Sequence, residues 1–198
     1  MSKLIRYQCF CVCDGQQEEM YLKHLARLLK TDTRTVVFDT KIGKPEIVFR
    51  NHRGRKTDKA AVFDYDRAEA DFERNLKACV RYGSIVAYSN LNFDLWILLH
   101  KQHFSQSVSK NNGYVALIRN AYGLEKTDNI KKEKIINRIL RQITLQDVKV
   151  AIHNAKTIRS SKIDSNAKKI SKINVYNNPD LLIHQFIEGV FEVCNESL

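Results

Sequence analysis

The stretch Lys59-Ala60-Ala61-Val62-Phe63-Asp64-Tyr65-Asp66 decides the fold. Its apolar residues follow one another without alternation, which is typical of a strand buried on both faces of a parallel sheet. Other segments have strand-like patterns, namely residues 4–13, 35–39 and 84–88. Between them, helical spacing covers residues 18–29, 68–82 and 93–100, and Pro45 opens a further short helix. Strands that alternate with helices form βαβ units, so we expect an α/β fold with a parallel sheet flanked by helices.

The second half of the chain has helical spacing and no strong strand pattern. The expected helices include residues 115–118, 135–140, 145–158 and 181–193. No linker rich in Pro or Gly separates the two halves. We therefore expect an α/β core over residues 1–104 and a mainly helical, basic part over residues 105–198 that packs on this core.

Composition limits the class of protein. The chain has 198 residues, of which 43% are hydrophobic, and its 33 basic against 22 acidic residues give a net charge of +11. A chain this apolar buries a core, which excludes a disordered protein. No apolar run is long enough for a membrane span, and the first residues resemble a strand more than a signal sequence. We expect a cytoplasmic protein with no membrane partner.

Three cysteines alternate along the first expected strand. Cys9, Cys11 and Cys13 therefore point to the same face of the sheet. Zinc binding is one use of such residues, but the spacing lacks a CxxC pair and no matching His/Cys pair follows. Buried, reduced thiols are the favoured interpretation.

Acidic and amide side chains follow three of the expected strands where these end. Asp14 follows the first strand, Asp64 and Asp66 follow the third, and Asn90 follows the fourth, with Asp94 close behind. Functional sites of open α/β sheets lie at the carboxyl ends of the parallel strands. Two carboxylates at D-x-D spacing both reach one Mg²⁺ if the backbone turns there. The alternative assigns Asp14 to a turn and Asp66 and Asp94 to helix caps.

Two basic segments predict contacts with the phosphates of nucleic acid. The residues proposed for this role are Arg50, Arg53, Arg55, Lys56, Lys162, Lys168, Lys169 and Lys172. Such contacts give affinity that depends on salt and not on base sequence. An ordinary solvated face is the alternative. The sequence has no Walker A loop, so any ATP dependence would come from a partner.

Three segments resemble the RloB-like family. They are Cys13-Asp14-Gly15-Gln16-Gln17-Glu18-Glu19-x-Tyr21, Val62-Phe63-Asp64-Tyr65-Asp66 and Ala87-Tyr88-Ser89-Asn90-x-x-Phe93-Asp94-Leu95-Trp96-x-Leu98-Leu99-His100. The late Asn178-Pro179-x-x-x-x-His184-x-x-Ile187 is similar to that family's closing helix. The family is grouped with Toprim-fold proteins, in which an acid after the first strand and a D-x-D after the third hold divalent metal. Its genes occur in prokaryotic restriction and phage-defence loci, often beside an ATPase partner.

The resemblance implies roles for individual residues. The implied catalytic residues are Asp14, Glu19, Asp64, Asp66, Asn90 and Asp94. Asp14, Asp64 and Asp66 would hold Mg²⁺ or Mn²⁺, which activates water and stabilises charge on a phosphodiester. The other three would orient the metal's waters or the substrate. Glu19 matches the family's second acid, whereas Asp14 and Asp94 stand where the family usually or often has Glu.

The sequence therefore predicts a Toprim-like core and a Mg²⁺-dependent nuclease in prokaryotic anti-phage defence, with abortive infection as its setting. The substrate is DNA or RNA, tRNA included. The alternative from another class is a non-catalytic subunit that binds nucleic acid or a partner in a defence complex. A nucleotidyl transferase or primase-like activity would use the same metal site. Self-association into a homo-oligomer and the identity of any ATPase partner are left open by the sequence.

Overall fold

A five-stranded sheet forms the centre of the computed structural model, which describes residues 5–52, 57–66, 68–110, 112–163, 165–196 and 198. The strands are β1 (Ile5–Cys13), β2 (Arg34–Ile42), β3 (Asp58–Asp64), β4 (Ile85–Asn90) and β7 (Asp180–Leu181). Their order is β2-β1-β3-β4-β7, and every neighbouring pair is parallel except β4 with β7. The predicted α/β class, with a mostly parallel sheet flanked by helices, is confirmed.

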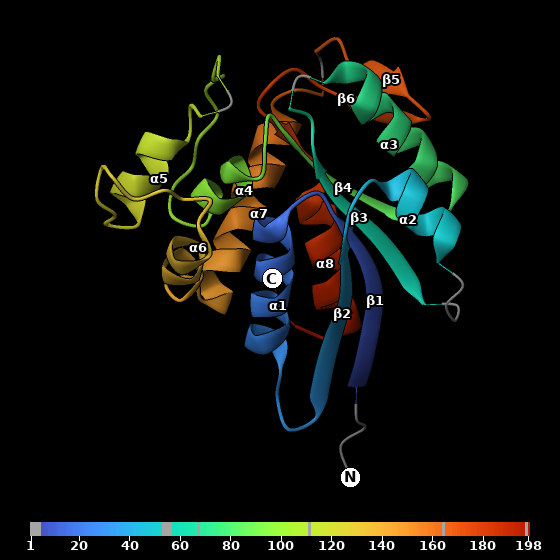
Figure 1. The fold of residues 1–198 in the computed structure, drawn as a ribbon, viewed down its shortest axis with the longest axis horizontal. Coiled ribbons are helices and arrows are strands. Elements are labelled where there is room, and N and C mark those ends of the chain that lie inside the picture. Colours follow the sequence, from blue (N-terminus) through green and yellow to red (C-terminus); the bar gives the residue numbers. More distant parts are fainter. Residues whose placement is uncertain (1–4, 53–56, 67, 111, 164, 197) are drawn as a thin grey trace.

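Helices cover both faces of the sheet (Figure 1). On one face lie α1 (Gln16–Leu29) and α8 (Ile183–Val193), and on the other lie α2 (Pro45–Asn51) and α3 (Glu69–Arg81). The remaining helices pack outside α1 and α8, and they are α4 (Asp94–Leu99), α5 (Val115–Ala121), α6 (Glu133–Leu140) and α7 (Leu145–Ser160). None of the helices in the described ranges has the length and apolar character needed to cross a bilayer.

Alternation along β1 divides the core into two parts. Cys9, Cys11 and Cys13 are fully buried with free thiols on the side of α1 and α8. Phe10 and Val12 point the other way and pack with the side chains of α2 and α3. This arrangement follows from the period of two in a strand, and it confirms buried, reduced thiols. Because helices cover both faces of the sheet, its polar side chains can reach solvent and ligands only at the ends of the strands.

The second half of the chain, which the sequence predicts to be mainly helical without a strong strand pattern, also contains short strands. Besides β7, it forms a hairpin of β5 (Lys168–Ile170) and β6 (Ile173–Val175). These strands have two or three residues each, which is too short for a periodic pattern to indicate them. The fully buried Asp180 anchors β7, because it accepts hydrogen bonds from the Tyr88 hydroxyl and, at 2.7 Å, from Nη1 of Arg159.

Candidate metal centre

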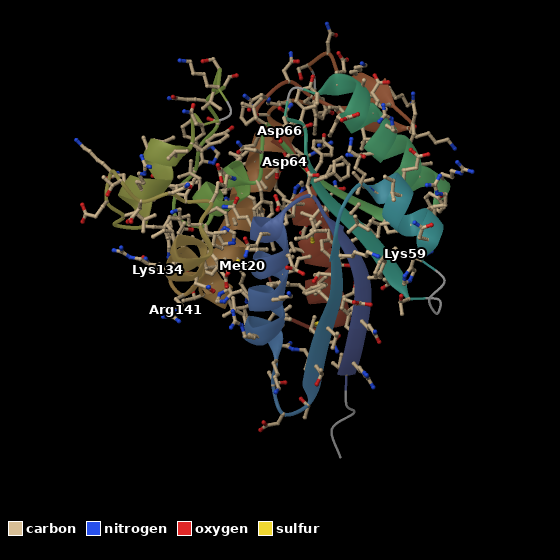
Figure 2. The ribbon with its side chains drawn as sticks, in the orientation of Figure 1. Met20, Lys59, Asp64, Asp66, Lys134 and Arg141 are labelled. Carbon is tan, nitrogen blue, oxygen red and sulfur yellow. The ribbon has the colours of Figure 1, made fainter. Side chains whose placement is uncertain are left out.

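Three aspartates meet at the carboxyl ends of β1 and β3. The two strands are parallel neighbours in which Cys13 pairs with Val62, so the residues that follow each strand lie side by side. One carboxylate oxygen from each of Asp14, Asp64 and Asp66 lies within 4.8 Å of the other two. Figure 2 shows Asp64 and Asp66 together at the upper end of the sheet. The structure thus brings together all three residues predicted to bind metal.

A turn directly after β3 positions Asp66. The backbone of Asp66 has a φ of +43°, in the left-handed region, which Asp adopts more readily than most residues. Its N–H donates to the carbonyl oxygen of Leu91 at 2.9 Å, and the N–H of Tyr65 donates to that of Ser89 at 3.1 Å. These two bonds fix the chain beyond the end of β3. The turn that a D-x-D metal site requires is therefore present.

The electrostatics of the three aspartates fit a cation. Burial raises the pKa of each carboxyl, and neighbouring carboxylates raise each further. For Asp64 these neighbours are Glu18, Asp66 and Asp14. The buried Oδ1 of Asp64 has no hydrogen-bond partner in the described part of the chain. Crowded carboxylates with an unsatisfied buried oxygen are a donor set suited to a hard divalent cation such as Mg²⁺ or Mn²⁺.

A lysine that the sequence analysis missed lies beside the acids. Nζ of Lys131 is 2.9 Å from Oδ1 of Asp94 and 2.7 Å from Oε1 of Gln17. Asp94 is only 1% exposed, and its Oδ2 has no hydrogen-bond partner among the described residues. Burial lowers the pKa of Lys131, but the attraction of Asp94, Asp64 and Glu18 outweighs burial and leaves this pKa raised. Lys131 is therefore a fixed positive charge at the edge of the acidic cluster.

Of the two adjacent glutamates on α1, Glu18 faces the acidic cluster and Glu19 does not. Glu18 is buried, and this burial raises its pKa to about 7, with Asp14 and Asp94 adding repulsion. Oε1 of Glu19 instead accepts a hydrogen bond of 2.8 Å from the hydroxyl of Thr40 on β2. Successive residues on a helix point about 100° apart, so only one of the pair reaches the site. The structure leaves Glu19 out of the cluster.

Two cavities border the cluster. The smaller, of about 250 Å³, includes Asp14, Asp64 and Asp66 in its lining. The larger, of about 550 Å³, includes Asp64, Asp66 and Asp94. The acids are thus accessible from two sides, and Lys131 borders both cavities.

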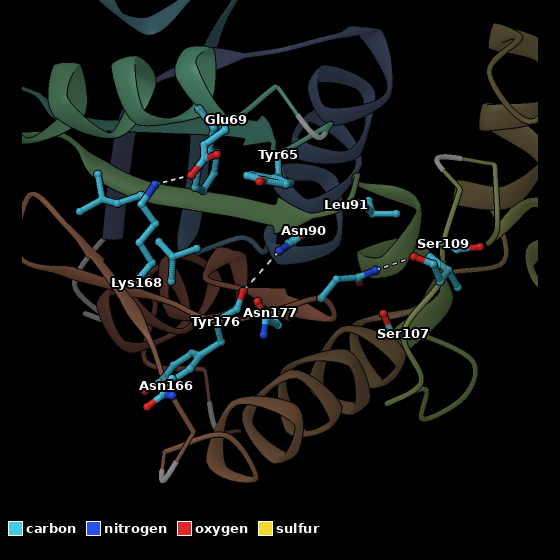
Figure 3. Close-up of a pocket in the computed structure, with 15 residues that line it drawn as sticks. Tyr65, Glu69, Asn90, Leu91, Ser107, Ser109, Asn166, Lys168, Tyr176 and Asn177 are labelled. Carbon is cyan, nitrogen blue, oxygen red and sulfur yellow. Dashed lines mark hydrogen bonds and ion pairs between the residues drawn. The ribbon is translucent and has the colours of Figure 1, made fainter.

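Asn90 lies apart from these cavities. It is 5% exposed at the end of β4, and its Nδ2 donates a hydrogen bond of 3.4 Å to the carbonyl oxygen of Tyr176. It lines a third cavity, which it shares with Tyr65 (Figure 3). Asn90 therefore lines a different cavity from the aspartates with which the sequence analysis grouped it.

Some residues of the predicted nucleic-acid surface are exposed. Arg50 is exposed in the last turn of α2, Lys169 in β5, and Lys172 in the turn before β6. The residues Arg53, Arg55 and Lys56 lie outside the described residues. Exposed charges of this kind are suited to phosphate contacts and equally to solvent.

Two other predicted basic residues have protein partners. Nζ of Lys168 forms ion pairs with Glu69 and, at 2.6 Å, with Glu73. Nζ of Lys162 donates a hydrogen bond to the carbonyl oxygen of Asn177. The ion pairs join β5 to α3, and the hydrogen bond joins the segment after α7 to the loop after β6, so the structure gives both lysines a role within the fold.

The fold and the site together define an α/β protein with a carboxylate cluster, suited to a divalent cation, at the carboxyl ends of its parallel strands. A family model described as RloB-like protein matches residues 9–188 of this chain. The chain therefore belongs to the RloB-like protein family, as the resemblance of its motifs predicted. No curated protein and no solved structure matches the chain significantly.

Proposed function

We propose that the chain is a metal-dependent nuclease of the Toprim type, which hydrolyses phosphodiester bonds of DNA or RNA, tRNA included. One observation carries this proposal. Carboxylate oxygens of Asp14, Asp64 and Asp66 lie within 4.8 Å of one another, at the strand ends where metal-dependent chemistry on an α/β sheet is expected. The resemblance to Toprim proteins and to defence-associated genes supports a role in prokaryotic anti-phage defence.

The three aspartates would hold Mg²⁺ or Mn²⁺ through their carboxylate oxygens. When bound, such a cation neutralises charge on phosphate oxygens and lowers the pKa of water. Asp94 holds Nζ of Lys131 beside the aspartates through their 2.9 Å ion pair. Half of the Lys131 side chain is exposed, and Asp94 and Gln17 take two of the three N–H donors of its ammonium group, so one donor remains for a phosphate. Lys131 thereby orients the scissile phosphate and offsets its charge.

The charge of the chain supports a polyanionic substrate. Its net charge is +11, and Arg50, Lys169 and Lys172 are exposed. Cations of this kind attract a phosphate backbone without reading its base sequence. A partner ATPase would supply any ATP dependence, because the sequence has no Walker A loop.

The proposal is tested by cleavage of labelled single-stranded DNA, duplex DNA, structured RNA and total tRNA with Mg²⁺ or Mn²⁺. The wild type should cut at least one substrate, and the double variant Asp64→Asn/Asp66→Asn should cut none while remaining folded. The matched control Asp39→Asn/Asp58→Asn, which alters two exposed aspartates, should cut as the wild type does. Equal cleavage by the wild type and the site variant would overturn the proposal.

A non-catalytic subunit that binds nucleic acid or a partner is the second candidate. One observation favours it, since Lys131 already compensates part of the acidic charge through its ion pair with Asp94. Such a subunit would keep its function in the Asp64→Asn/Asp66→Asn variant. It would lose nucleic-acid affinity in Lys169→Ala/Lys172→Ala, which removes the two exposed hairpin lysines and spares the paired Lys168.

A further inference from the structure

The largest of the described cavities lies beside the metal centre and is distinct from it. Its volume is about 640 Å³, within the range of ligand-binding pockets. Four segments enclose it: the start of α3, the end of β4, residues 107–109, and the β5–β6 hairpin with the loop that follows (Figure 3). Tyr65 belongs to its lining and stands in the chain between Asp64 and Asp66. A ligand in this cavity is therefore next to the acidic cluster.

The wall nearest the metal centre presents an aromatic ring. The ring of Tyr65 packs edge-on against Phe72, with ring centroids 5.0 Å apart and an interplanar angle of 84°. This contact fixes the orientation of the Tyr65 ring. The hydroxyl of Tyr65 forms no hydrogen bond within the described ranges, and the side chain is partly exposed. Tyr65 thus offers a ring held in place and a free polar end to whatever enters the cavity.

Amide groups form part of the lining, together with two serines and apolar side chains such as Leu91, Val108 and Ile170. Figure 3 shows Asn90 between Tyr65 on one side and Asn177 on the other. Asn90 is 95% buried, and its Oδ1 has no hydrogen-bond partner in the part of the chain that the structure describes. Leaving a buried acceptor unpaired is costly, so this oxygen requires a donor that none of the described residues supplies. The exposed Asn166 and Asn177 add further amide groups at the rim.

The charges of the lining cancel one another. Lys168 and Glu69 both line the cavity, and they form an ion pair with each other (Figure 3). Lys168 also pairs with Glu73, so two carboxylates compensate the charge of its ammonium group. The cavity therefore favours a neutral, planar and polar group over a phosphate or a carboxylate.

We propose that this cavity binds the base of an unpaired nucleotide in the substrate strand, next to the phosphate at the metal centre. Bases combine a flat π face, which stacks on an aromatic ring, with edge donors and acceptors, which asparagine amides recognise. This inference rests on the proposed nuclease function and adds its substrate class. The substrate is a single strand, a loop or an extruded nucleotide, because a base within a duplex cannot enter the cavity.

The first test measures binding without metal, so that it does not depend on cleavage. Fluorescence polarisation in EDTA compares a labelled single strand of mixed sequence, in DNA and RNA form, with an abasic strand of the same length and charge. The wild type should bind the base-bearing strand roughly 10-fold or more tightly than the abasic one. Tyr65→Ala should remove most of this difference, and Tyr65→Phe should retain it because the ring remains. Equal affinity of the wild type for both strands would overturn the proposal.

A second variant keeps the base-binding proposal testable if Tyr65→Ala does not fold. Asn177→Ala alters an exposed rim residue whose side chain makes no hydrogen bond in the described residues, and it should reduce the preference for bases by a smaller factor. Free nucleoside monophosphates that bind as tightly as the strand would also contradict a strand-binding pocket. The two proposals fail separately. If the chain prefers base-bearing strands but cuts no substrate, only the nuclease proposal is refuted. If it cuts a substrate but shows no preference for bases, only the base-binding proposal is refuted.

Discussion

Replacing Asp64 with Asn should stabilise the metal-free protein, because it relieves repulsion within the acidic cluster. Carboxylate oxygens of Asp14, Asp64 and Asp66 lie within 4.8 Å of one another, and two unit charges at this separation repel by about 3.5 kcal/mol at an effective dielectric constant of about 20. Asp64 has two such neighbours. Lys131 and partial protonation offset most of this repulsion. We expect the free energy of unfolding to rise by about 1–3 kcal/mol at a pH of about 8, which lies well above the ordinary pKa of an Asp carboxyl.

The same substitution should abolish the response to Mg²⁺. A site with a Kd of about 1 mM adds about 1.4 kcal/mol of stability in about 10 mM Mg²⁺. In a protein of this length, 1 kcal/mol corresponds to about 2–4 °C in Tm. Scanning calorimetry in EDTA and in Mg²⁺ should therefore show that Mg²⁺ raises the Tm of the wild type by about 3–6 °C and does not change the Tm of Asp64→Asn.

A matched variant controls for the loss of one acidic residue. Asp39 is exposed on β2 and lies outside the cluster, so Asp39→Asn should keep both the metal-free Tm and the Mg²⁺ response of the wild type. The reasoning would be refuted if Asp64→Asn lowered the metal-free Tm and still gained stability from Mg²⁺. That result would mean that neither repulsion nor metal binding is centred on this carboxylate.

Three further predictions concern other parts of the structure. Lys131→Met should lower the free energy of unfolding in urea by about 1 kcal/mol, because the buried Asp94 loses its counter-ion. The loss is small because half of the lysine side chain is exposed, so that solvent weakens the ion pair. Asp180→Asn should cost about 3 kcal/mol in the same assay, because it leaves Arg159 without its 2.7 Å partner at a buried site. Burial lowers the pKa of His100 from 6.5 to about 4. The contribution of His100 to the free energy of unfolding should thus be fully present above a pH of about 6.5. It should fall by up to about 3 kcal/mol as the pH decreases toward 4, because this imidazole takes up a proton at a higher pH in the unfolded chain than in the folded one.

Exposed residues provide the controls for these three predictions. Lys134→Met, Asp39→Asn and His153→Gln alter exposed side chains of the same types and should change stability little. Equal losses in Lys131→Met and Lys134→Met would show that the ion pair with Asp94 is not the cause. Acid sensitivity that persists unchanged in His100→Gln would assign the titration to another group.

The sheet could be predicted from sequence because its signals are local. The apolar run from Ala60 to Phe63 marks a strand covered on both faces, and the structure buries all four residues in β3. The acids at positions 14, 64 and 66 could be grouped because parallel strands end at the same edge. The pair at Asp180–Leu181 could not be recognised as a strand, because its assignment depends on pairing with β4 and on the buried partners of Asp180.

The completion of the site depends on contacts between distant segments. Lys131 lies 37 residues from Asp94 along the chain and belongs to no sequence motif, so only the folded structure shows their ion pair. The choice of Glu18 over Glu19 depends on the rotation of α1 against the sheet, which the pattern of two adjacent glutamates does not fix. Asn90 is the last residue of β4, at the strand end where the sequence analysis expected it, but its side chain lines the neighbouring cavity.

The most direct test of the metal centre is the location of Mn²⁺ in crystals grown or soaked with this ion, measured by anomalous scattering. The account predicts a peak at coordination distance, about 2 Å, from carboxylate oxygens of Asp14, Asp64 and Asp66. The peak should disappear in the Asp64→Asn/Asp66→Asn variant. A wild-type crystal in Mn²⁺ with no peak at these carboxylates, or with peaks only elsewhere, would contradict the account.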